Sequence, residues 1–98
     1  MPRSVHILIP DTWIVDPKGL LGIDVDEHGR PAPHDEDLWQ ASKGTWLLDV
    51  GASRGYVGTA FLCHVIQEHD WRQPIEKVLL DTPGEVQAWV NRWVRRIP

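Results

Sequence analysis

The sequence predicts an α+β fold, in which a mixed or antiparallel sheet of four or five strands carries an amphipathic C-terminal helix on one face. Three observations lead to this prediction. Short apolar runs with β-branched residues recur along the chain, separated by Pro, Gly and Asp. The residues Thr82-Pro83-Gly84-Glu85 form a capping box with proline at the first helical position. After this cap, apolar residues recur at helical spacing as far as Ile97.

Length and composition predict one small domain over residues 1–98. The chain is 42% hydrophobic and 24% charged, which is typical of a globular protein. No apolar run approaches the ~20 residues of a membrane span, and the N-terminus does not resemble a signal peptide. Cys63 is the only cysteine, so an intramolecular disulfide is excluded. We therefore expect a soluble, cytoplasmic protein that does not bind a membrane.

The first half of the chain predicts three extended segments and a short helix. Ser4–Ile9 alternates apolar residues and ends at a proline, residues 11–15 are a second extended piece, and Leu20–Val25 is a third strand. The helix is predicted near residues 35–43, with Asp35 as the N-cap and two acids in the first turn. Gly44 then suits the position just beyond the last turn.

The second half predicts a central hairpin, one more strand and the long helix. Residues 45–50 read as a strand, the small residues 51–55 as a five-residue turn, and Tyr56–Ile66 as a second strand because of its aromatic and β-branched content. A helix over Tyr56–Ile66 is the open alternative. Ile75–Leu80 is predicted as a further strand. The C-terminal helix runs from about Pro83 to Arg96.

Residues 47–55 resemble the first motif of S-adenosylmethionine-dependent methyltransferases, especially the D-x-G-x-x-x-G turn of the ribosomal-RNA type. The resemblance implies that Asp49, Gly51 and Gly55 would line a cofactor pocket. It covers about nine residues. In dinucleotide folds, a second strand ends in an acid that holds the ribose roughly 20 residues later. Here that region is the polar stretch 67–71, so we predict no cofactor.

The same turn also fits the G-x-S-x-G pattern of the α/β-hydrolases, which makes Ser53 a candidate nucleophile. That chemistry needs an acid and a histidine from separate later loops, and His64 and His69 follow too closely to supply them. No complete catalytic set is therefore predicted, and the domain is expected to be non-enzymatic. The turn remains a candidate ligand site, with the residues Gly51, Ser53, Arg54 and Gly55.

Acidic residues concentrate in the first half of the chain. Residues 1–50 hold nine acids and four Lys or Arg, a net charge of −5, whereas residues 51–98 hold five acids and six Lys or Arg, a net charge of +1. The segment 24–37 begins with the spacing of acidic residues that is typical of an EF-hand calcium loop. Its prolines and His28 depart from that pattern, so no metal site is predicted. The candidate acidic binding face comprises Asp24, Asp26, Glu27, Asp35, Glu36 and Asp37.

These patterns favour a small regulatory domain, similar in kind to an inhibitor or adaptor, that binds a protein partner through the acidic face and tryptophan anchors. The six tryptophans suit either a Trp-rich core or such a binding surface. A homodimer is an open alternative.

A second hypothesis is a nucleic-acid-binding module, which would use a basic patch of Arg72, Arg92, Arg95 and Trp71. A third is ligand or cofactor binding at the turn 51–55.

Overall fold

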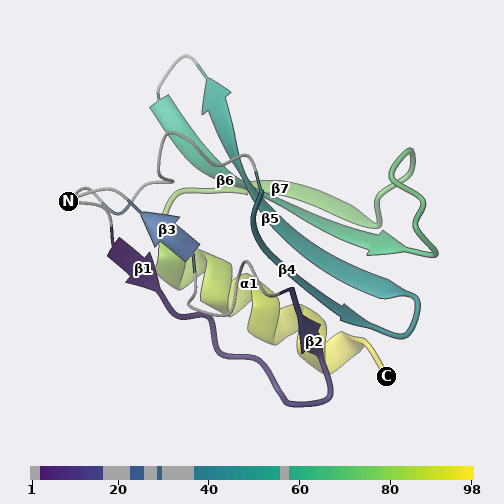
Figure 1. The fold of residues 1–98 in the computed structure, drawn as a ribbon. Helices are drawn as coiled ribbons and strands as arrows, with labels where there is room; N and C mark the ends of the chain where they lie inside the picture. The colour runs from purple at the N-terminus through teal and green to yellow at the C-terminus, as the bar shows by residue number, and fades with distance from the viewer. Residues whose placement is uncertain (1–2, 17–22, 26–28, 30–36, 56–57) are drawn as a thin grey trace.

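The computed structural model describes residues 3–16, 23–25, 29, 37–55 and 58–98. These residues form a five-stranded antiparallel sheet, a separate two-stranded antiparallel sheet and a C-terminal helix, so the predicted α+β class is confirmed (Figure 1). The strand order in the larger sheet is β2-β4-β5-β6-β7, and β1 pairs with β3. The elements are β1 (Arg3–Val5), β2 (Ile14–Val15), β3 (Ile23–Val25), β4 (Asp37–Lys43), β5 (Trp46–Gly55), β6 (Gly58–Gln67), β7 (Glu76–Leu80) and α1 (Pro83–Arg96).

The short helix predicted near residues 35–43 is wrong from Asp37 onward, because Asp37–Lys43 is strand β4. Gly44 has φ +59°, and Lys43 pairs with Trp46, so Gly44 opens a two-residue hairpin loop. A glycine with positive φ occurs both beyond a helix C-terminus and at the first position of a type II′ turn. The sequence signal was therefore correct for the backbone angle but was assigned to the wrong element.

A β-bulge in β4 explains why its sequence resembled a helix. The pairing register shifts between Asp37 and Trp39, so that Leu38 has no partner of its own opposite β5. Both Leu38 and Trp39 are buried in the core as a result. Two adjacent inward residues fit the period of a helix better than the alternation of a strand.

The predicted five-residue turn at 51–55 is also wrong. These residues lie within β5, which runs on to Gly55, and Gly55 is paired with Gly58 of β6. The two strands, of ten residues each, therefore form one long hairpin. The strand prediction for Tyr56–Ile66 is confirmed from Gly58 onward, and residues 56 and 57 lie outside the described part.

Helix α1 covers one face of the sheet, as predicted. Thr82 is the N-cap, and its hydroxyl accepts a hydrogen bond from the Glu85 N–H at 3.1 Å. Val86, Trp89, Val90 and Trp93 are buried on the inward side of the helix. They pack with side chains of β4, β5 and β6 and of the N-terminal segment into one hydrophobic core.

Two contacts fix the helix in place. The Glu76 carboxylate on β7 accepts hydrogen bonds from the indole N–H groups of Trp89 at 2.8 Å and Trp93 at 2.5 Å. On the other side, the Gln87 side chain bonds to both backbone groups of Leu8, at 2.7 Å to the N–H and 2.8 Å to the carbonyl. The helix is thus tied both to the sheet edge and to the N-terminal segment (Figure 1).

The tryptophans belong largely to the core. Trp13, Trp39, Trp89 and Trp93 are buried in it, and Trp46 packs partly against it. Trp71, in the β6–β7 loop, is exposed. In the described residues, no helix is both long enough and apolar enough to cross a membrane.

Candidate functional site: the open face of the sheet

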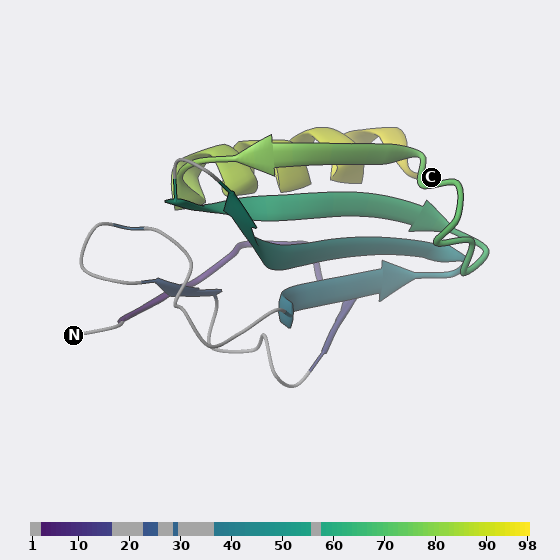
Figure 2. The same cartoon turned by 90° about the horizontal axis from the view of Figure 1, so that it is seen from above.

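The face of the sheet opposite α1 carries no helix or strand among the described residues. Figure 2 looks onto the strands from above, and no described element lies across β4, β5, β6 and β7, while α1 lies behind them. Side chains alternate between the two faces of a strand, so the pairing register identifies the residues on this side. We call it the open face, and it includes Gln40, Ser42, Leu47, Asp49, Gly51, Leu62, His64, Ile66, Lys77 and Leu79, with Ile14 at the β2 edge and Ile75 before β7. Of these, Asp49, Gly51 and Ile66 are buried.

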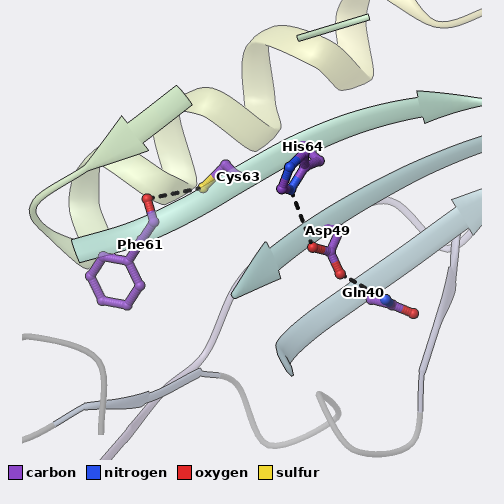
Figure 3. Close-up of polar contacts among 5 residues, drawn as sticks. All are labelled: Gln40, Asp49, Phe61, Cys63 and His64. Atoms are coloured by element: carbon purple, nitrogen blue, oxygen red, sulfur yellow. Dashed lines mark hydrogen bonds and ion pairs between the residues drawn. The ribbon is translucent and has the colours of Figure 1, made fainter. Parts of the chain in front are cut away.

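One row of polar residues crosses the open face. Gln40 pairs with Asp49, Asp49 with His64 and His64 with Lys77, so four neighbouring strands each contribute one polar side chain. We call these four residues the polar row. Gln40 Nε2 donates a hydrogen bond to Asp49 Oδ1 at 2.7 Å, and His64 Nδ1 lies 3.7 Å from Asp49 Oδ2 (Figure 3).

The centre of the polar row is shielded from water. Asp49 is only 6% exposed, and the His64 side chain is 17% exposed. The Nδ1 atom of His64 is buried and makes no hydrogen bond. Burying a polar nitrogen without a partner costs free energy, and Asp49 is close enough for a small shift of the ring to complete a bond.

The Asp49–His64 pair lacks a nucleophile among the described residues. Ser53 lies on the same face of β5 but four residues from Asp49, which is about 13 Å along a strand. Cys63 points to the opposite face and is buried. Burial, followed by the charges of Asp49 and Glu76, raises the pKa of its thiol to about 12, so Cys63 is not a thiolate near neutral pH.

Apolar side chains lie on both sides of the polar row. On one side Leu47 pairs with Ile66, and on the other Leu62 pairs with Leu79. Several of these side chains contact water: Ile14 is 74% exposed, Leu79 59%, Ile75 50% and Trp71 48%. Leu8, the other large apolar side chain that is strongly exposed in the described residues, lies outside the sheet. The exposed apolar groups on this side thus lie at the two edges of the sheet, Ile14 at β2 and the others at or beside β7.

A strained turn positions Trp71 beside His64. Glu68 and His69 have φ +56° and +59°, and the Asp70 N–H donates to the Gln67 carbonyl at 3.1 Å. Glu68 and His69 are the two central residues of the turn that this hydrogen bond closes. Positive φ at both central residues defines a type I′ turn, in which Asn or Gly normally occupies these positions. The indole ring of Trp71 then meets the His64 ring edge-on, with centroids 5.6 Å apart.

The residues predicted as sites are distributed over separate parts of the fold. Of the acidic face, Asp24 lies in β3 and Asp37 begins β4, while Asp26, Glu27, Asp35 and Glu36 fall outside the described residues. Gly51, Ser53, Arg54 and Gly55 belong to β5 rather than to a turn.

The four residues of the predicted basic patch do not lie together. Arg92 and Arg95 are exposed on α1, where they line a shallow depression with Ala88, Asn91 and Arg96. Trp71 and Arg72 line a different depression, formed by the β6–β7 loop. Trp71 contacts His64 on the open face, whereas α1 covers the other face.

The polar row was missed because the hairpin register was misassigned. A turn at 51–55 places Asp49 opposite residue 57, whereas the observed pairing places it opposite His64. The glycines at 55 and 58, which flank residues 56 and 57, were the available signal for the shorter loop.

Comparison with protein families, with curated proteins and with solved structures gave no match. The described residues contain no group of three or more His, Cys, Asp or Glu side chains arranged to hold a metal ion. Any assignment of function therefore depends on the chemistry of the open face itself.

Proposed function

We propose that this chain is a small non-enzymatic protein-binding domain, and that the open face is its binding surface. The observation that supports this most is that Ile14, Trp71, Ile75 and Leu79, all about half exposed or more, lie on one side of the sheet. Ile14 lies at the β2 edge and the other three at or beside the β7 edge. Several large exposed apolar side chains on one face of a small protein are typical of an interaction site. Aromatic anchors such as Trp71 also contribute strongly to protein interfaces.

The polar row gives such a surface its specificity. A partner would have to match the exposed Lys77 ammonium, because burying a charge without a complement is costly. The acidic residues between 24 and 37 are proposed as a charged rim that aids association rather than as the anchor. A regulatory role as an inhibitor or adaptor is compatible with this arrangement.

The test is a comparison of two Leu→Lys variants. Leu79 is 59% exposed on the open face and Leu8 is 66% exposed away from it, so neither change buries a charge in the core. Affinity capture from source-cell lysate, after nuclease treatment, should retain a stoichiometric protein partner with the wild type and Leu8→Lys. Leu79→Lys should lose it. Equal retention by both variants would contradict the proposal.

Nucleic-acid binding through α1 is a second candidate. Arg92, Arg95 and Arg96 are exposed along the last turns of the helix, and the Arg96 guanidinium lies 5.3 Å from the centre of the Trp93 ring. Such a site predicts affinity that falls steeply with salt. The absence of any mobility shift with single- or double-stranded DNA or RNA at low salt would eliminate it.

A further inference from the structure

We infer that the partner protein binds through an extended, acidic peptide segment, which adds a further strand to the sheet at the outer edge of β7. This inference depends on the proposed function, because it names the chemistry of the partner and the part of the open face that it occupies. In such a binding mode the main-chain hydrogen bonds supply affinity, and the alternating side chains of the added strand supply specificity.

The outer edge of β7 is the sheet edge that suits such pairing best. In the five-stranded sheet β7 is the last strand, and among the described residues it pairs with β6 alone. No backbone hydrogen bond from a described turn, loop or cap reaches residues 76–80. A strand edge of this kind can pair with another segment. The opposite edge offers less, because β2 comprises two residues whereas β7 comprises five.

Exposed apolar side chains lie along this edge. Ile75 is 50% exposed just before β7, Leu79 is 59% exposed within it, and Trp71 is 48% exposed in the preceding loop. Because side chains alternate along a strand, Ile75 and Leu79 lie on the open face with Lys77 between them. An added strand with apolar residues at two alternate positions would cover Ile75 and Leu79.

The charge at the centre of this edge is positive and unpaired. Lys77 is exposed and forms no ion pair with a described residue. A carboxylate beside it on the added strand would supply one, and opposite charges on neighbouring strands stabilise the pairing. The edge therefore fits a peptide with an acidic residue midway between two apolar ones, at alternate positions. This pattern is the same in either strand direction.

Two arginines of α1 extend the positive charge toward the start of β7. The indole N–H of Trp93 donates to the carboxylate of Glu76, the first residue of β7, so this flank of α1 lies against the strand. The Arg96 guanidinium lies 5.3 Å from the centre of the Trp93 ring, and Arg92 lies one turn before Arg96. Both arginines are exposed, and neither forms an ion pair with a described residue. Further acidic residues at this end of the peptide would meet them.

The same charges disfavour other occupants of the edge. Two copies of this chain paired through β7 would bring two sets of Lys77, Arg92 and Arg96 together, and like charges at an interface are costly. A nucleic acid would match the charges, but it has no peptide groups with which to continue the sheet. An acidic peptide satisfies the backbone edge, the apolar side chains and the charges together.

Titration with designed peptides tests the inference. The probe is the capped peptide acetyl-Glu-Glu-Val-Thr-Glu-Thr-Val-Glu-Glu-amide, and its control has Lys in place of each Glu. The acidic peptide should shift the amide NMR signals of residues 75–80 and slow hydrogen exchange in β7, because the edge becomes interior to the sheet. The control should do neither. No change at about 1 mM acidic peptide, which half-saturates even a site of millimolar affinity, would overturn the inference.

Charge reversal at Lys77 provides a matched test. Lys77→Glu should weaken binding of the acidic peptide by about fivefold and strengthen binding of the lysine peptide, because a favourable cross-strand pair becomes a like-charge pair. Lys43→Glu makes the same change on β4, away from this edge, and should leave both affinities nearly unchanged. Equal effects of the two variants would show that net charge governs binding, and the inference would fail.

The outcomes separate this inference from the proposed function. If the acidic peptide does not bind but Leu79→Lys loses the captured partner that Leu8→Lys retains, the inference fails and the proposed function stands. If the peptide does not bind and both Leu→Lys variants capture the partner equally, both fail. A wild-type dimer that Leu79→Lys dissociates would place a second copy at this edge and would also overturn the inference.

Discussion

Asp49 is a carboxylate that is almost fully buried and depends on its neighbours. It accepts a 2.7 Å hydrogen bond from Gln40 Nε2 and lies 3.7 Å from His64 Nδ1. Removing it by Asp49→Ala leaves the Gln40 amide without its acceptor, which costs about 1–3 kcal/mol of unfolding free energy. Urea denaturation measures this loss. Asp11→Ala, at an exposed position, is the control and should change stability by less than about 0.5 kcal/mol; equal effects would show that the polar row adds no stability.

Cys63 should be protected from thiol reagents by the fold. Burial is the main cause that raises its thiol pKa from 9.0 to about 12. The thiol pKa is therefore higher in the folded state than in the unfolded state. The contribution of the thiol to the free energy of unfolding is fully present below about pH 9 and is lost as pH rises from about 9 to about 12. Iodoacetamide at pH 8 should therefore label the protein slowly in buffer and rapidly in urea. Rapid labelling of the folded protein would contradict the buried position.

Contacts between elements decide how α1 attaches to the sheet. Glu76 accepts from the indole N–H groups of both Trp89 and Trp93, and a charged acceptor makes such bonds stronger. Glu76→Gln keeps the shape but removes the charge, so we expect a loss of about 1–2 kcal/mol in unfolding free energy, measured by urea denaturation with tryptophan fluorescence. Glu68→Gln, in the exposed loop, should have little effect. A similar loss for both would mean that Glu76 does not anchor the helix.

The β6–β7 turn stores strain that a single substitution can release. Glu68 and His69 both have positive φ angles, which cost a residue with a side chain roughly 1–2 kcal/mol each. His69→Gly should raise the unfolding free energy by up to about 1 kcal/mol, after the larger chain entropy of glycine is subtracted. Thermal melting measures the change. Gln73→Gly introduces the same residue where φ is not positive and should be destabilising; stabilisation by Gln73→Gly instead would refute the strain argument.

The elements that the sequence predicted best are those with complete local signals. The cap at Thr82 and the apolar stripe after it define α1 from end to end, since both depend on residues within a few positions of one another. The hairpin register depends instead on pairing between distant residues. Gly51 and Gly55 could equally form a turn or lie within a strand, and only the partner strand decides between them.

The same physical reason explains why the candidate site was not predicted. The polar row joins residues from four strands that span positions 40 to 77, and a shift of register by one residue turns a strand's side chains to the other face. The exposed arginines of α1, by contrast, followed directly from its helical period. A binding surface built on a sheet therefore becomes visible only once the pairing is known.

Stability should be distributed unevenly across the whole molecule. Strands β5 and β6 are each hydrogen-bonded to neighbours on both sides, whereas β2 comprises two residues at the edge of the sheet and β1 pairs with β3 alone. Amides in the middle of a sheet exchange only when large parts of the fold open. Native-state hydrogen exchange should therefore show the slowest amides in β5 and β6 and much faster exchange in β1, β2 and β3. Protection of β2 equal to that of β5 would be incompatible with this order and would imply that a further contact covers the β2 edge.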